Sequence, residues 1–92
     1  MTDILERRLS VSPHAVESAV GDETVILHLK NGTYYGLDPV GTRIWALLKA
    51  GVATADICRQ LGEEYAVDLP TIEADARKFL TDLEAQGILI DG

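Results

Sequence analysis

The side chains of this sequence that could act as nucleophiles, bases or metal ligands are few and widely spaced. Its one cysteine is Cys58, and its two histidines are His14 and His28. A metal site needs several ligating side chains at short, regular spacing, and neither histidine has such neighbours. A cysteine nucleophile needs a base within reach, and the sequence indicates none near Cys58. We therefore expect no catalytic residue, no metal site and no cofactor.

The other charged residues and the glycines have simpler structural explanations. The carboxylates of the second half fall on the polar faces of predicted helices, where water or nearby arginines would satisfy them. The glycines do not match a phosphate-binding loop. Gly36 lies inside a predicted strand, which indicates either a bulge or another backbone passing close by. The sequence leaves both readings open.

Composition and charge restrict the function further. The chain has 92 residues, enough for one small domain, and 47% of them are hydrophobic, as in folded proteins. Its net charge of -7 argues against a nucleic-acid partner, because phosphate binding relies on clustered Lys and Arg. Acidity suits a basic peptide partner, although it also simply keeps a small protein soluble. With no membrane-spanning run, no signal peptide and a lone cysteine, we expect no membrane partner and a cytoplasmic location.

The first twenty residues predict an arm followed by a strand. Residues 1–12 carry mixed charges and few apolar residues, so we expect a flexible arm in which Leu9 and Val11 are candidates for a short strand. Ala15–Val20 alternates weakly between apolar and polar residues, and the turn signal Gly21-Asp22 follows it. We expect the first strand of the sheet at Ala15–Val20.

A β-hairpin is predicted next, and the length of its loop decides which side chains face the core. Residues 24–29 are rich in β-branched residues, and Asn31-Gly32 is a strong hairpin signal. A two-residue loop would split the apolar side chains between the two faces. A three-residue loop of residues 30–32, with Gly32 in the left-handed region, gathers them on one face, so we prefer it. The side chains that it gathers are Val25, Leu27, Leu29, Tyr35 and Leu37.

Three helices are predicted in the second half. Asp38-Pro39 starts the first, because Asp38 can cap the free amides and Pro39 suits the first turn, and Gly51 ends it. The second spans about Thr54–Tyr65. The third, about 70–86, has the clearest amphipathic pattern. Residues 88–90 are a candidate for a short final strand.

The predicted order is therefore a three-stranded antiparallel sheet followed by three helices, an α+β fold with the parts of a winged helix-turn-helix. Such a sheet needs a second layer to bury its apolar face, and the helices supply that layer. We expect one domain over residues 1–92. The residues expected in its core are Leu27, Leu29, Leu37, Ile44, Leu48, Phe79 and Leu83.

The third predicted strand, residues 33–37, lies at an edge of the sheet if the strands follow in order. An edge strand has unpaired N–H and C=O groups that can pair with an extended peptide. Tyr34 and Tyr35 add aromatic surface of the kind that anchors interfaces. From the residues alone, the edge could equally be covered by the N-terminal arm or by a second copy of the chain.

An ordered set of residues resembles a known family. Its members are Glu23, Asn31-Gly32, Tyr34, Tyr35, Leu37-Asp38, Gly41, Ile44-Trp45 and Leu47-Leu48. Residues 9–14 resemble the usual start of the family, and Leu80, Leu83 and 87–89 resemble its usual end. The set resembles the PqqD-like family of RiPP recognition elements. The tyrosine-rich hairpin and the GLDPVG run are most similar to its stand-alone lasso-peptide leader-binding proteins.

The resemblance implies a binding protein and not an enzyme. Members of this family bind the leader of a ribosomally made precursor peptide as an added strand, and they present the peptide to a separate maturation enzyme. In the lasso branch that enzyme is a leader peptidase. One alternative is a PqqD-type chaperone for a radical SAM peptide-modifying enzyme. A second is a winged-helix DNA-binding regulator, which the element order permits but the acidic charge disfavours.

The resemblance also implies where the leader lies, in a groove between the third strand and the third helix. On the strand, the implied binding residues are Thr33, Tyr34, Tyr35, Gly36 and Leu37. On the helix, they are Ile72, Asp75, Ala76 and Phe79. Which of the helix residues face the groove, and which face the core, the sequence leaves open.

Overall fold

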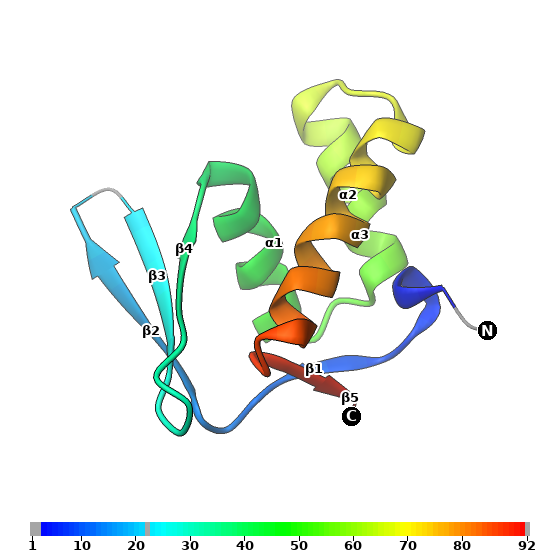
Figure 1. Ribbon diagram of the computed structural model, residues 1–92. Coiled ribbons are helices and arrows are strands. Elements are labelled where there is room, and N and C mark those ends of the chain that lie inside the picture. The colour runs from blue at the N-terminus through cyan, green and yellow to red at the C-terminus, as the bar shows by residue number, and fades with distance from the viewer. Residues whose placement is uncertain (1–2, 22, 92) are drawn as a thin grey trace.

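The computed structural model describes residues 3–21 and 23–91 (Figure 1). Its main sheet is antiparallel, in the order β2-β3-β4, and consists of Ala15–Val20, Glu23–His28 and Tyr34–Leu37. Three helices follow this sheet in the described part of the chain, so the predicted α+β class and element order are confirmed. Asp22 of the predicted turn, and the first two residues of the predicted arm, lie outside the described residues.

The helices begin and end close to the predicted positions. They are α1 (Pro39–Lys49), α2 (Thr54–Tyr65) and α3 (Leu69–Ala85). The Asp38 side chain caps α1 by accepting a hydrogen bond of 2.6 Å from the Gly41 N–H. Figure 1 shows α1 between β4 and the α2–α3 pair. None of the helices in the described ranges combines the length and apolar character that crossing a membrane would require.

The N-terminal segment forms a second, smaller sheet with the C-terminus. β1 (Leu9–Val11) pairs antiparallel with β5 (Leu89–Asp91), and both short strands were candidates in the sequence. A single turn of 3-10 helix, η1 (Ile4–Glu6), precedes β1. Figure 1 shows β1 and β5 side by side beneath the helices.

This segment is packed from Asp3 onward, which differs from the flexible arm expected for residues 1–12. Leu5 is buried in the core, and the Thr54 hydroxyl donates a 2.5 Å hydrogen bond to its carbonyl. The Arg7 guanidinium pairs with the carboxylates of Glu84 and Asp91. The few apolar residues of this segment suffice to hold it because each meets the core or β5.

The hairpin between β3 and β4 has a longer loop than predicted. Ile26 lies opposite Tyr35, and the His28 N–H donates to the Thr33 carbonyl at 2.8 Å, which leaves residues 29–32 as a four-residue loop. Gly32 has the expected left-handed conformation, with φ of 73°. The prediction of a three-residue loop is therefore wrong, and the shift of one residue reverses the two faces of β3.

The reversed faces correct the predicted core. Leu27 and Leu29 are 38% and 63% exposed, whereas Ile26 and His28 are buried. The prediction assumed that the more apolar face must be buried. Here the turn itself satisfies the histidine, because the Nδ1 atom of His28 accepts hydrogen bonds from two backbone N–H groups of the loop, at 3.2 and 3.3 Å.

The rest of the predicted core is largely confirmed. Leu37, Ile44, Leu48 and Leu83 are buried, while Phe79 is partly buried and packs against the core. The helices and the segment before β5 supply most of the fully buried large side chains. These are Ile26, Ile57, Leu61, Leu80, Leu83, Ile88 and Leu89, together with Cys58.

Candidate functional site

The outer edge of β4 carries unpaired backbone groups. β4 has β3 as its one strand neighbour, and backbone groups in an antiparallel ladder point alternately to the two sides. Since the Thr33 carbonyl bonds to β3, the next residue that turns its backbone to β3 is Tyr35. The N–H and C=O groups of Tyr34 and Gly36 therefore point away from the sheet. Among the described residues, none of these four groups has a hydrogen-bond partner.

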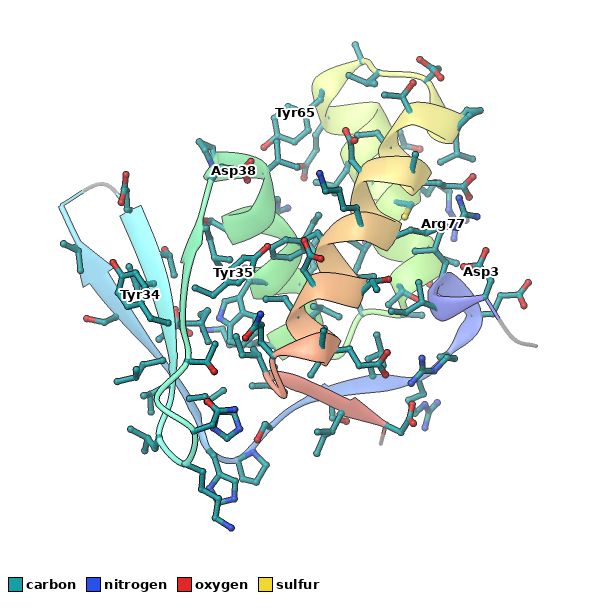
Figure 2. The ribbon with its side chains drawn as sticks, viewed as in Figure 1. Asp3, Tyr34, Tyr35, Asp38, Tyr65 and Arg77 are labelled. Atoms are coloured by element: carbon teal, nitrogen blue, oxygen red, sulfur yellow. The ribbon has the colours of Figure 1, made fainter. Side chains whose placement is uncertain are left out.

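A cleft of about 360 Å³ lies between β4 and α3, with α1 at its base. Figure 2 shows Tyr35 pointing from β4 toward the helices, whereas Tyr34 points the opposite way. The lining residues from β4 and α3 are Tyr35, Asp75, Lys78, Phe79 and Asp82. Those from α1 and its cap are Asp38, Val40, Gly41 and Ile44.

Tyr35 joins the two sides of the cleft. Its ring meets the ring of Phe79 edge to face, with centroids 6.2 Å apart. Burial raises the pKa of the Tyr35 phenol, and the neighbouring carboxylates of Asp82 and Asp38 raise it further. Both influences favour the neutral phenol over the phenolate.

Gly41 allows Phe79 to lie where it does. A Cβ atom at Gly41 would lie 3.0 Å from Asp38 Oδ1 and 3.1 Å from Phe79 Cε1, closer than real Cβ contacts normally are. The missing side chain thus admits both the capping carboxylate and the edge of the phenyl ring. By leaving this space empty, Gly41 lets the Phe79 ring pack close to the start of α1 at the floor of the cleft.

The cleft is acidic around an apolar floor. Its charged side chains are the carboxylates of Asp38, Asp75 and Asp82 and the ammonium group of Lys78. Phe79 and the α1 residues supply the apolar surface. Such a site can accept apolar side chains and favours a positively charged neighbour over a negatively charged one.

The structure divides the predicted helix residues between the cleft and the core, which the sequence left open. Asp75 and Phe79 line the cleft. Ile72 and Ala76 are 6% and 2% exposed and belong to the hydrophobic core. They are not among the residues that line the cleft.

The predicted strand residues also fall into groups. Tyr35 lines the cleft, and Leu37 is buried in the core. Tyr34 is 69% exposed on the face of the sheet away from the helices. Gly36 pairs in register with Val25, so the bulge reading is wrong, and a Cβ there would meet nothing within 4 Å.

Sequence reasoning missed two groups of cleft residues. Lys78 and Asp82 could have been found, because with Asp75 and Phe79 they follow the spacing of a single helix face. The residues of α1 could not, since only the packing of α1 between β4 and α3 brings them to the cleft. They are Val40, Gly41 and Ile44, with the cap Asp38.

The described residues offer little for catalysis. Cys58 is buried on α2, and this burial raises the pKa of its thiol above the ordinary value. Within residues 3–21 and 23–91, no group of three or more His, Cys, Asp or Glu side chains could hold a metal ion.

Comparisons with known proteins find solved structures of similar fold. A solved structure described as "TbiB1 in Complex with the TbiA(beta) Leader Peptide" is 45% identical, with a TM-score of 0.81 over 87% of this chain and 93% of that chain. A second, "Lasso peptide synthetase B1 complexed with the leader peptide", has a TM-score of 0.83 over 90% of this chain and 98% of that one. At 24% identity, the second shows the shared fold alone.

A search of curated proteins finds no match. The model of the family described as "Coenzyme PQQ synthesis protein D (PqqD)" matches residues 23–89, from the start of β3 to β5. This match covers the hairpin, the cleft and all three described helices, and it confirms the resemblance found in the sequence. The chain belongs to the PqqD family.

Proposed function

We propose that this protein binds the leader segment of a ribosomally made precursor peptide and presents it to a separate maturation enzyme. The leader adds to β4 as a fourth strand. The observation that carries the proposal is the open edge at Tyr34 and Gly36, which lies beside the cleft lined by Tyr35 and Phe79. The solved relative at 45% identity is itself described as a complex with a leader peptide.

The proposed mechanism divides affinity and selectivity between backbone and side chains. Main-chain hydrogen bonds to Tyr34 and Gly36 hold any extended peptide in register. Side chains alternate along a strand, so every second leader side chain points toward the helices and into the cleft. There, Phe79 and Tyr35 contact apolar groups, and Asp75 attracts a positive charge.

The proposed binding residues are those given by the resemblance, and their positions in the structure support the following roles. Thr33 and Leu37 lie at the two ends of the strand that pairs with the leader. Tyr34 contacts the leader from the outer face of the sheet. Ile72 and Ala76 support α3 from the core side. Asp82 and Lys78 extend the site along α3.

The proposed precursor is a lasso peptide, and the proposed enzyme is a leader peptidase. The support is the tyrosine-rich hairpin together with the GLDPVG run, residues 36–41. A radical SAM partner is the alternative within the same family. The protein would act in the cytoplasm, where ribosomes make precursor peptides, as an adaptor without catalytic activity of its own.

Calorimetric titration with the TbiA(beta) leader peptide tests the proposal. Gly36→Pro removes one open-edge N–H of β4, so binding should be lost. Ala19→Pro is the matched control, because the alternation of β2 turns the Ala19 N–H to the opposite edge of the same sheet. Binding that survives Gly36→Pro, or a gel shift with duplex DNA in place of peptide binding, would contradict the proposal.

A further inference from the structure

A buried histidine holds the loop between β3 and β4. The side chain of His28 accepts hydrogen bonds at Nδ1 from the Lys30 and Asn31 N–H groups, at 3.2 and 3.3 Å, and the residue is 7% exposed. A ring nitrogen that accepts an N–H carries no proton itself, so the proton of the neutral ring is on Nε2. Nε2 faces Gly87, where a Cβ atom would lie 3.5 Å from it. The folded loop therefore requires this one neutral form of His28.

The same loop joins the two walls of the β4 cleft. The Asn31 side-chain amide donates to the Gln86 carbonyl, at the end of α3, at 3.2 Å. Its Oδ1 atom accepts from the Thr33 N–H at 2.8 Å, and β4 begins at the next residue, Tyr34. The loop thus sets the start of β4 relative to α3.

Protonation of His28 is incompatible with these contacts. A proton on Nδ1 would point at two N–H donors and would leave both without an acceptor, in a site too buried for water to replace it. His14, from the segment before β2, lies beside the ring with centroids 5.8 Å apart, and Lys30 belongs to the loop itself. Both are positively charged when protonated, and neither can stabilise a second positive charge. Gln86 and Gly87, which approach from the end of α3, are uncharged.

We infer that His28 is a positioning residue of the leader cleft and makes leader binding sensitive to pH. With Nδ1 unprotonated, the ring holds the loop, and through it the start of β4, against the end of α3. A proton on Nδ1 releases the loop, so the open-edge groups of Tyr34 lose their fixed position beside the cleft. The inference rests on the function proposed above, because it concerns the same site. His28 acts through the loop backbone and does not touch the leader.

Leader affinity measured against pH tests this inference. Calorimetric titration with the TbiA(beta) leader peptide at about pH 7.5 and about pH 5.5 spans the range in which histidine side chains ordinarily gain their charge. We expect the affinity to fall about tenfold at the lower pH, as the loss of one or two hydrogen bonds would cause.

Two substitutions separate the hydrogen-bond acceptor from the charge. His28→Leu fills the site without an acceptor, so it should weaken leader binding at both pH values. His28→Asn places Oδ1 close to the position of Nδ1, so it should restore the binding that His28→Leu loses. Because an amide does not titrate, binding by His28→Asn should not change with pH. His14→Asn is the matched control and should keep the wild-type pH dependence. Thermal melting checks that each variant is folded.

The outcomes distinguish this inference from the proposed function. An equal fall in affinity for the wild-type protein and His28→Asn, or a pH dependence that disappears in His14→Asn, would overturn the role of His28. An imidazole ¹⁵N spectrum that placed a proton on Nδ1 of His28 in the free protein at neutral pH would overturn it as well. No leader binding at either pH would instead refute the proposed function. The amide signals of Lys30 and Asn31 in the free protein would then still decide whether acid releases the loop.

Discussion

The rings of Tyr35 and Phe79 meet at an interplanar angle of 67° across the cleft, one from the edge strand and one from α3. This contact joins the open edge of β4 to the helix opposite it. A peptide that pairs with β4 must place its inward side chains against these two rings. The position of Phe79 in turn depends on Gly41, whose missing side chain leaves room for the ring.

Gly41→Ala should therefore damage the cleft. The added methyl group overlaps Phe79 and the capping carboxylate of Asp38, so the ring or the carboxylate must shift. Overpacking of this kind costs about 1–3 kcal/mol of stability, and leader affinity should fall with it. The matched control is Gly62→Ala in α2, where a Cβ would meet only Val67 O at 3.4 Å. Calorimetry that found equal leader affinity in both variants would show that Phe79 does not shape the site.

The corrected core predicts a sharp difference between two leucines that the sequence placed in the core together. Leu83→Ala empties a fully buried position and should cost about 2–5 kcal/mol. Leu29→Ala changes an exposed side chain and should cost less than about 0.5 kcal/mol. Urea unfolding of the two variants measures both. A large loss for Leu29→Ala would restore the face that the sequence favoured.

The raised pKa of Tyr35 predicts how stability changes at high pH. Because folding raises this pKa, the protonated phenol stabilises the folded state fully below the unfolded value of about 10. That contribution is lost as pH rises through the folded pKa. Asp82→Asn removes one of the causes and should lower the folded pKa of Tyr35, although burial still holds it above the ordinary value. The ring-carbon NMR shift of Tyr35, followed against pH in the wild-type protein and in Asp82→Asn, gives the two folded pKa values. An unchanged pKa in Asp82→Asn would exclude an effect of Asp82 on the phenol.

The acidic lining predicts salt-dependent leader binding. A leader with lysine or arginine near the cleft should bind more weakly as salt rises from about 0.05 to 0.5 M, because ions screen its attraction to the carboxylates. Asp75→Asn should reduce both the affinity, by about 0.3–1 kcal/mol, and the salt dependence. Lys78→Gln is the control with the opposite sign, because it removes the positive charge of the cleft, and it should strengthen binding of such a leader. A salt dependence that Asp75→Asn leaves intact would place the charge contact elsewhere.

Local chemistry made the helices predictable and left the hairpin register ambiguous. Asp38-Pro39 fixes the start of α1 by a cap that acts within four residues. The hairpin register, in contrast, depends on whether His28 can be buried. The answer lies in two loop amides that reach Nδ1 only once the four-residue turn has formed. The alternation of apolar residues does not show whether a polar ring such as that of His28 has hydrogen-bond partners when it is buried.

The candidate site was predictable in part for a similar reason. The resemblance implied Asp75 and Phe79 as groove residues together with Ile72 and Ala76, but the sequence left open which of these four face the groove. The contribution of Gly41 needs the crossing of α1 under α3, which no local pattern specifies. The packed N-terminal segment was equally hidden, because the burial of Leu5 depends on contacts of η1 with α2 and α3, which are distant in the sequence.

An amide-shift map of the labelled protein, titrated with the TbiA(beta) leader peptide, tests the central claim most directly. If the leader adds to β4, the N–H signals of Tyr34 and Gly36 should move far more than those of Tyr35 and Leu37, because only the former lack a partner in the free protein. The same two amides should become protected from hydrogen exchange. Silent Tyr34 and Gly36 signals, with shifts confined to α2 and β1, would contradict strand addition at this edge.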